Sequence, residues 1–235
     1  MTQPFIPASR PSAALPGGID SWIFDLDNTL YPASSSLFPQ IDFKMRAYIA
    51  RLLDLSLDDA FRLQKQYYRD YGTTLRGLMA VHGVLPEAFL DYVHDIDHSV
   101  LEPAPRLAAA LKALPGRRII YTNGSEKHAL AVLDRLGLEG CFEAIFDIAA
   151  AGYLPKPERS SYDALIARHR IDPVRAVLVE DIARNLAPAA EIGMTTVLVR
   201  DPGAPSWGVG PDGDLSFIDH VTEDLAGWLK AAALS

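Results

Sequence analysis

Two aspartates separated by one residue follow the first apolar run of the chain, in residues 25–29 (DLDNT). Side chains at this spacing, on the turn that leaves a strand, can both approach one phosphate. Asp25 could then attack phosphorus, which is the covalent route open to a carboxylate. Asp27 could protonate the leaving oxygen and later accept a proton from water. We therefore expect Asp25 to stay ionised and Asp27 to have a raised pKa. The alternative is a polar turn in which both aspartates cap backbone groups.

A second group of polar residues follows later apolar runs and could bind phosphate oxygens. Thr122 and Asn123 can donate hydrogen bonds, and the amide of Gly124 stands at an expected helix start, where anions bind. Lys156 precedes Pro157 in a loop and supplies a compact positive charge for the nucleophile and the transferring phosphoryl group. These residues predict a phosphate site.

An acidic pair, Glu180 and Asp181, ends another apolar run and indicates a metal site. Mg²⁺ prefers oxygen ligands and keeps several of its waters, so it needs few carboxylates from the protein. An ion held by Asp25 would screen the repulsion between that carboxylate and a phosphate dianion. Nucleophile, hydroxyl, lysine and acidic pair each follow an apolar run, in that order, which argues against a set of unrelated polar turns.

These polar residues need a sheet whose strands all end at one edge. Apolar runs and helical stretches alternate along the chain, a pattern typical of a Rossmann-like, doubly wound parallel α/β sheet with its site at the carboxyl ends of the strands. The expected strands are residues 22–24, 118–121, 144–148, 176–179 and 195–199, and the expected helices between them are residues 125–136, 161–169 and 184–192.

Residues 34–103 interrupt this alternation and contain no convincing strand. Ser56 resembles a helix cap, and apolar residues recur at helical spacing on both sides of it. We expect an all-helical cap domain over the active-site edge. The expected domains are a loose N-terminal tail (1–18), a catalytic core (19–33 and 104–235) and the inserted cap (34–103), with helices at 37–53 and 86–94.

The composition limits the classes of partner. The 235 residues are 49% apolar and 22% charged, as in an ordinary globular protein, and the net charge of -8 disfavours a nucleic-acid surface. No apolar run approaches the roughly 20 residues of a membrane span, and the N-terminal stretch lacks the apolar centre of a signal peptide. We expect a soluble cytoplasmic protein, and the sequence does not indicate its oligomeric state. The single cysteine, Cys141, is expected to be a small buried apolar side chain.

The motifs together resemble the signature of the haloacid dehalogenase superfamily, most of whose members are phosphatases with a Rossmann-like core. The resemblance covers residues 19–199, including the place of a helical cap. The dehalogenase branch lacks the second aspartate of the first motif, so the resemblance favours phosphatase chemistry. It implies Asp25 as nucleophile, Asp27 as acid and base, Thr122 and Lys156 as phosphate ligands, and Mg²⁺ held by Asp25, the carbonyl of Asp27 and Asp181, with Glu180 nearby or bound through water.

Four segments are similar, more narrowly, to the pyrimidine 5′-nucleotidase group: residues 25–32, 71–77, 92–98 and 180–186. This similarity implies hydrolysis of UMP or CMP to nucleoside and phosphate. The same chemistry on nicotinamide mononucleotide, a sugar phosphate or phosphoglycolate is an alternative, as are a phosphate-moving mutase and a non-catalytic regulator that binds a phosphorylated metabolite. A regulator would be expected to lose Asp25, Asp27 or Lys156.

Several cap residues admit two interpretations. We expect Arg76 to face the core site and contact the nucleoside, because residues 71–77 break an otherwise apolar helical region. Tyr67, Tyr68 and Tyr71 could stack on a base, although their helical spacing favours packing.

Other polar residues are expected to have supporting roles. His94 and His98 could share a helical face as metal ligands, but a structural or hinge role is favoured. We expect His128 and His169 either at the surface or just behind the site, and Asn185 to support the acidic loop. Residues 201–214 form a Gly- and Pro-rich loop, which could be a lid or a surface excursion.

Overall fold

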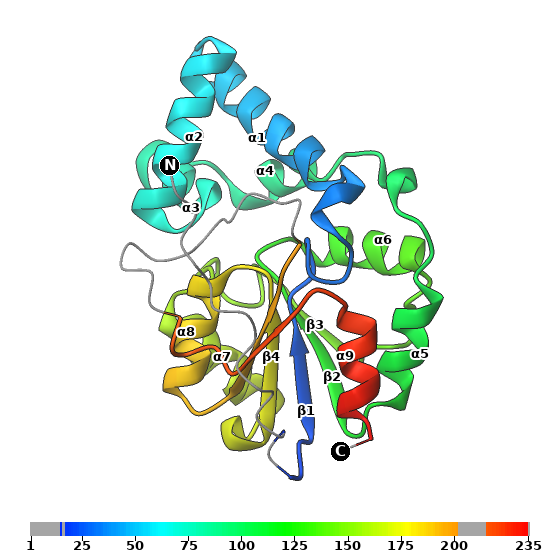
Figure 1. Cartoon of the computed structure of the whole chain (residues 1–235). Helices are drawn as coiled ribbons and strands as arrows, with labels where there is room; N and C mark the ends of the chain where they lie inside the picture. Colours follow the sequence, from blue (N-terminus) through cyan, green and yellow to red (C-terminus); the bar gives the residue numbers. More distant parts are fainter. Residues whose placement is uncertain (1–14, 16, 202–214, 235) are drawn as a thin grey trace.

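A parallel sheet is the centre of the protein (Figure 1). The computed structural model describes residues 15, 17–201 and 215–234, so most of the expected tail and of the 201–214 loop lies outside the described residues. Among those that are described, six strands form one sheet: β1 (Ser21–Phe24), β2 (Arg117–Tyr121), β3 (Ala144–Phe146), β4 (Ala176–Glu180), β5 (Thr195–Val199) and β6 (His220–Thr222).

The strand order is β3-β2-β1-β4-β5-β6, and every neighbouring pair is parallel. The order reverses direction between β1 and β4, which are paired from Ser21 with Ala176 to Phe24 with Val179. In open α/β sheets the crevice beyond the carboxyl ends of two such strands is the usual binding site. The two acidic motifs follow these two strands, so the topology brings them to the same crevice.

Helices cover both faces of the sheet. Successive residues of a strand point to opposite faces, so Trp22 and Phe24 join one apolar cluster and Ile23 joins the other. The first cluster includes α5 (Pro105–Ala113), α6 (Glu126–Leu136) and α9 (Leu225–Ala232), and the second includes α7 (Arg159–His169) and α8 (Ala183–Glu191).

The predicted fold class, a doubly wound parallel α/β core with a helical insertion, is confirmed. Gly137 ends α6 in the left-handed conformation, as its sequence position predicts. Cys141 is buried in the first cluster, as expected. None of the described helices combines the length and the apolar character needed to cross a membrane.

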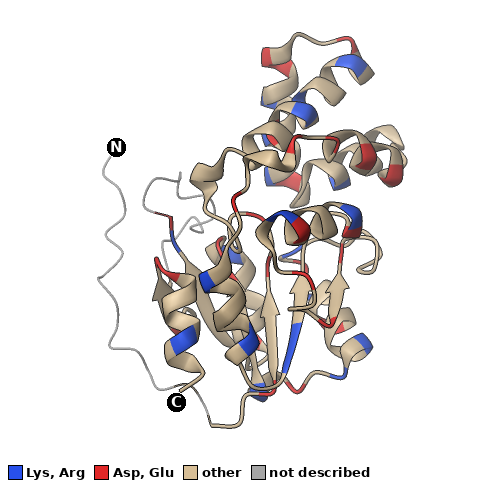
Figure 2. Cartoon of the chain, turned by 90° about the vertical axis from the view of Figure 1, so that its right-hand side faces the viewer, with Lys and Arg blue, Asp and Glu red and all other residues tan. Residues whose placement is uncertain are grey.

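Four helices form the insertion between β1 and α5, above the ends of the strands (Figure 2). They share a separate apolar cluster, to which the core contributes Ile148. Ser56 caps the second helix by accepting a hydrogen bond from the amide of Asp59, as predicted, and Thr73 caps the third. The bounds 34–103 for the cap stay a prediction. The helices are α1 (Phe38–Leu53), α2 (Leu57–Tyr71), α3 (Thr74–His82) and α4 (Pro86–Val93).

Tyr67 packs inside this insertion. Its ring is buried, its hydroxyl lies 2.6 Å from Nε2 of His82, and its ring meets that of Tyr71 edge to face. Gly77 of α3 lies so close to Tyr67 that a Cβ added to the glycine would be 2.5 Å from Cβ of the tyrosine. The junction of α2 and α3 therefore depends on a residue without a side chain.

We predict that Gly77→Ala destabilises the cap. The added methyl overlaps the base of the Tyr67 side chain, which cannot move away without shifting α2, so the free energy of unfolding should fall by about 1–3 kcal/mol. Urea denaturation is the measurement. Gly17→Ala is the matched control, because a Cβ at Gly17 meets nothing within 4 Å. Equal stability of the two variants would contradict this packing.

Candidate active site

Asp25 lies immediately beyond β1, at the reversal point of the sheet. Its amide donates to the carbonyl of Val179 at 2.9 Å, which continues the pairing of β1 with β4. Its carboxylate is almost completely buried: Oδ1 accepts from Nζ of Lys156 at 2.7 Å, and Oδ2 accepts from Oγ1 of Thr29 at 2.8 Å. Asn28 adopts a left-handed conformation, with φ at 61°, in the turn that returns Thr29 to the aspartate. The predicted nucleophile is therefore held rigidly.

Lys156 is a fully buried cation that joins several strand ends. Besides Asp25, its ammonium contacts Oε1 of Glu180 and the carbonyl of Tyr121, each at 2.9 Å. Burial acts to lower the pKa of Lys156, but the two carboxylates raise it overall, so the side chain is charged. Asn123 fixes the lysine loop, since its Oδ1 accepts from the Lys156 amide at 2.9 Å and its Nδ2 donates to the Lys156 carbonyl at 3.3 Å. The predicted substrate contact of Asn123 stays a prediction, and its side chain is engaged with the lysine loop.

Thr122 and Gly124 lie beside the first motif. Thr122 is buried at the end of β2, and its Oγ1 accepts from the amide of Gly124 at 2.9 Å. A Cβ built on Gly124 would be 3.3 Å from that Oγ1 and 3.7 Å from Oδ2 of Asp27. Glycine therefore leaves open the space between the hydroxyl and the second aspartate, next to the start of α6, where a phosphate oxygen could bind.

Glu180 is buried at the end of β4, and both of its carboxylate oxygens accept hydrogen bonds from neighbouring residues. Oε1 accepts from Nδ2 of Asn185 at 2.6 Å as well as from Lys156, and Oε2 accepts from the amide of Ile182 at 2.5 Å. The expectation that Asn185 supports the acidic loop is confirmed. Among the described residues, Oε1 of Glu180 accepts two hydrogen bonds, whereas each oxygen of Asp25 accepts one, so Asp25 and Asp181 are the better direct ligands for a metal.

Asp25, Glu180 and Asp181 form a group suited to a cation. One oxygen from each residue lies within 4.8 Å of the other two. Within residues 15, 17–201 and 215–234, these three residues form the group that could hold a metal ion. Burial, Glu180 and Asp25 together raise the pKa of Asp181 well above its usual range. Three carboxylates around one lysine leave excess negative charge in a place of low polarity, and their oxygens are the ligands that Mg²⁺ prefers. The residues fit a magnesium ion.

The two aspartates of the first motif have pKa values in the reverse of the predicted order. Burial raises the pKa of Asp25 to about 7, although Lys156 acts to lower it. Burial acts to raise the pKa of Asp27 as well, but His128 and the Tyr31 hydroxyl bring it down to about 2. These partners set the order in the protein without a metal ion, and the expected order beside a metal stays a prediction. A positive charge among the carboxylates would lower the pKa of Asp25, and the negative charge of a phosphate would raise the pKa of Asp27.

Asp27 is surrounded by residues that sequence reasoning placed only loosely. Oδ1 accepts from Nε2 of His128 at 2.8 Å and from Oη of Tyr31 at 2.5 Å. His128 is buried, so the surface alternative for it is wrong and the position behind the site is correct. Tyr31 was not among the predicted site residues. The signal for it was present, since Tyr31 follows the first motif by two residues.

His94 and His98 belong to the segment that returns from α4 to the core. Nδ1 of His94 lies 2.8 Å from Oγ of Ser125, and Nε2 of His98 lies 3.2 Å from Nδ1 of His128. Both residues thus contact the start of α6, and the structural or hinge role favoured from the sequence stays a prediction. His169 is half-buried near Arg117, at the opposite end of the strands, and takes no part in the site.

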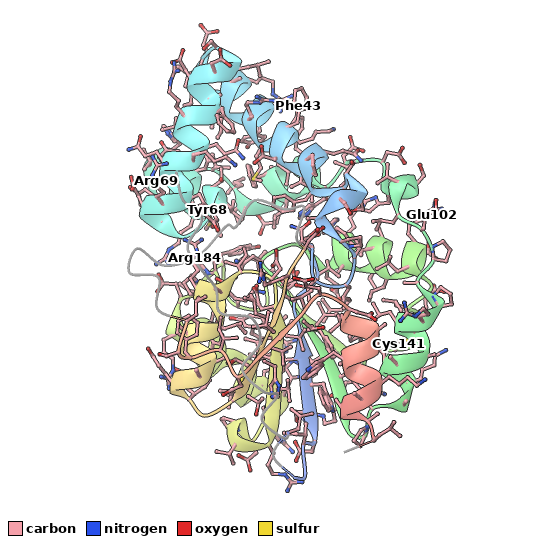
Figure 3. The ribbon with its side chains drawn as sticks, viewed as in Figure 1. Phe43, Tyr68, Arg69, Glu102, Cys141 and Arg184 are labelled. Atoms are coloured by element: carbon pink, nitrogen blue, oxygen red, sulfur yellow. The ribbon has the colours of Figure 1, made fainter. Side chains whose placement is uncertain are left out.

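The cap contacts the core around the site through two arginines. Arg76 of α3 faces the core as expected, and its guanidinium pairs with Glu158 at 2.7 Å, two residues after Lys156. Arg184 of α8 stacks over the ring of Tyr68 of α2, 4.2 Å from its centre, and donates to the carbonyl of Gly72 (Figure 3). Tyr68 was predicted as a possible base-stacking residue, whereas Arg184 was not among the predicted site residues.

Comparison with known proteins gives the family of the chain. The model of haloacid dehalogenase-like hydrolases matches residues 19–193, which include both acidic motifs, the lysine and the helical insertion. The chain belongs to this family of hydrolases.

Two curated relatives extend over most of the chain. It is 24% identical over 195 residues to Phosphate metabolism protein 8 of Saccharomyces cerevisiae, a match that covers 75% of this chain and 60% of the yeast protein. The chain thus spans less than two thirds of that relative. It is 28% identical over 199 residues to Glyceraldehyde 3-phosphate phosphatase of Methanopyrus kandleri, which covers 77% of this chain and 84% of the archaeal protein. These relatives are similar in sequence over both the core and the insertion.

A solved structure shows the same fold. The crystal structure of a HAD phosphatase from Thermococcus onnurineus superposes with a TM-score of 0.58 and 19% identity, over 90% of this chain and 97% of that one. At this level of identity the likeness establishes the fold.

We predict that Asp181→Asn stabilises the protein when EDTA removes divalent cations. The pKa of Asp181 is higher in the folded chain than in the unfolded one, so the folded state binds more protons and stability should fall as pH rises above about 4. At pH 8 the variant should exceed the wild type by at least about 1 kcal/mol in free energy of unfolding. Urea denaturation at pH 5 and pH 8 in EDTA is the measurement.

Added Mg²⁺ should stabilise the wild type and leave Asp181→Asn nearly unchanged, because a ligand stabilises only a state that binds it. Asp70→Asn, on the exposed surface of α2, is the control and should follow the wild type in every condition. A variant less stable than the wild type at pH 8 in EDTA would show that the carboxylates do not repel one another.

Proposed function

We propose that this hydrolase is a Mg²⁺-dependent phosphomonoester hydrolase that works through an aspartyl-phosphate on Asp25. The observation that carries the proposal is the placement of the Asp25 carboxylate, 2.7 Å from the buried Lys156 ammonium and within the acidic group that fits a cation. A nucleophilic carboxylate needs positive charge on both sides, because it must approach a phosphate dianion.

The chemistry divides between the two aspartates. An oxygen of Asp25 attacks phosphorus, a bond to the aspartate forms, and the bond from phosphorus to the leaving oxygen breaks. Lys156 and the hydroxyl of Thr122 offset the charge on the phosphoryl oxygens. Asp27 gives a proton to the leaving oxygen, and in the second half it takes one from the water that releases phosphate. Mg²⁺, held by Asp25, the carbonyl of Asp27 and Asp181, would supply further positive charge beside the phosphate.

The names of the relatives support the class of reaction. The archaeal relative is named as a phosphatase of glyceraldehyde 3-phosphate, and two further bacterial relatives are named enolase-phosphatase E1. These names share the word phosphatase, and the archaeal one names a small phosphorylated metabolite as its substrate. A non-catalytic regulator is disfavoured, because Asp25, Asp27 and Lys156 are all present and placed together.

We further propose a pyrimidine nucleotide, UMP or CMP, as the substrate. Four sequence segments resemble the pyrimidine 5′-nucleotidase group, and the boundary between cap and core carries a ring and two arginines. Tyr68 of the cap lies beneath Arg184 of the core, and Arg76 of the cap faces Glu158. An aromatic ring and a guanidinium plane are surfaces on which a base can stack. Nicotinamide mononucleotide, sugar phosphates and phosphoglycolate are the alternatives. A cytoplasmic location is part of the same proposal and is supported by the acidic, single-cysteine composition.

Phosphate release across a panel of phosphomonoesters tests the proposed function. The panel comprises UMP, CMP, AMP, GMP, nicotinamide mononucleotide, phosphoglycolate, glyceraldehyde 3-phosphate and several sugar phosphates, each with Mg²⁺ or EDTA. We expect release from UMP and CMP that requires Mg²⁺ and is at least about 1,000-fold slower in Asp25→Asn. Activity on other members alone would contradict the pyrimidine substrate and retain the mechanism. Equal activity of wild type and Asp25→Asn would contradict the mechanism.

We predict that Arg76→Ala raises the KM for UMP by about tenfold, the effect of losing roughly 1.4 kcal/mol of binding. The KM for p-nitrophenyl phosphate should change much less, since this small ester does not reach the cap. Steady-state kinetics on both esters measures the difference. Arg69→Ala is the control, because Arg69 lies on the exposed surface of α2 (Figure 3). An equal rise for both esters would show that Arg76 only docks the cap through Glu158.

A further inference from the structure

Three histidines gather behind Asp27, and the mechanism above uses none of them. His128 comes from the first turns of α6, whereas His94 and His98 come from the segment between α4 and α5. The rings of His94 and His128 are stacked, with centres 4.4 Å apart and planes 10° from parallel. Imidazoles are costly to bury without hydrogen bonds, and here each ring has a partner: Ser125 for His94, His128 for His98, and Asp27 for His128.

His128 is fixed on every side. Its side chain has no exposed surface. Nε2 donates to Oδ1 of Asp27, Nδ1 lies 3.2 Å from Nε2 of His98, and one face of the ring packs on His94. Its amide donates to Oγ of Ser125, the helix cap, at 3.3 Å, so the backbone is held as well. The ring cannot turn without breaking a hydrogen bond, and Nε2 is therefore kept pointing at the aspartate.

This arrangement gives the two oxygens of Asp27 different surroundings. Oδ1 accepts both hydrogen bonds, from His128 and from Tyr31. Oδ2 accepts none from the described part of the chain and lies on the side of Gly124, beside Thr122. One oxygen is thus bound to the protein, and the other faces the expected phosphate ligands.

We propose that His128 is a positioning residue for Asp27: it holds Oδ1 so that Oδ2 faces the leaving oxygen, while His94 and His98 lock the ring in place. The proposal rests on the phosphatase function proposed above. In the first half of the reaction Oδ2 carries the proton that the leaving oxygen accepts as its bond to phosphorus breaks. In the second half the same oxygen accepts a proton from the attacking water. Without His128, among the described residues only the Tyr31 hydroxyl holds Oδ1, so the carboxyl can turn about this single contact and both transfers lose their alignment.

A pair of esters that differ in leaving group separates positioning from a general structural effect. Phenyl phosphate and p-nitrophenyl phosphate have nearly the same size, but nitrophenolate is a much weaker base than phenolate and leaves without a proton. The first turnover of each, followed by rapid quench in the presence of Mg²⁺, reports on the first half of the reaction alone.

We expect His128→Leu to slow the first turnover of phenyl phosphate by about 100-fold, the usual scale of general acid catalysis. The burst of nitrophenolate should stay within about threefold of the wild type and be followed by slow turnover, because hydrolysis of the aspartyl-phosphate also needs Asp27. His128→Gln should restore most of the phenyl phosphate rate, since its amide nitrogen reaches the position of Nε2. His128→Asn is too short and should behave as the leucine variant.

The controls keep the test decisive. His169→Leu changes a histidine at the other end of the sheet and should leave both bursts unchanged. His98→Ala leaves the bond between His128 and Asp27 in place and should give a smaller effect with the same leaving-group dependence, which also serves if the leucine variant does not fold. Equal slowing of both esters by all His128 variants would overturn the proposal. Release of either phenol by Asp25→Asn at the wild-type rate would instead contradict the proposed function on which it rests.

Discussion

The buried ammonium of Lys156 is the interaction on which the rest of the site depends. It touches Asp25 beyond β1, the carbonyl of Tyr121 in β2 and Glu180 at the end of β4, while its own loop follows β3. One charge thus connects four neighbouring strands of the sheet. A buried ion is tolerated only where partners satisfy it, and buried carboxylates are tolerated only where a cation neutralises them. The lysine and the acidic residues therefore require one another, and the strand order brings them together.

Charge is handled differently on the two sides of the crevice. Around Asp25 the carboxylates outnumber the cation, so a proton or a metal is favoured there. Around Asp27 the carboxyl receives hydrogen bonds from Tyr31 and His128, so its ionised form is favoured. The chemistry proposed for the two aspartates needs the opposite order of pKa values, with Asp25 ionised and Asp27 able to hold a proton. A metal and a phosphate would supply it, because each adds charge next to the aspartate whose pKa must move. The unliganded residues are thus arranged to respond to ligands.

The sequence was sufficient to predict the features that depend on neighbouring residues along the chain. Apolar runs that end in polar residues identified β1, β2 and β4 and the residues that follow them, because parallel strands share one carboxyl edge. It failed where the partner is remote. His128 lies 101 residues from Asp27, and nothing in a local pattern links the two, so the hydrogen bond that lowers the pKa of Asp27 was missed. The three-residue β6 and the contact of Arg184 with Tyr68 were missed for the same reason.

The pairing of Asp25 with Val179 has a consequence for how the protein moves. The amide proton of Asp25 is bonded to the central strand next to it, between two layers of buried side chains. Such a proton exchanges with solvent only when the whole core opens, whereas helices held by their own smaller cluster can open separately. We therefore expect the reacting atoms to be attached to the slowest-exchanging part of the backbone. The cap helices can fluctuate, and diverge in sequence, without changing the position of the attacking oxygen.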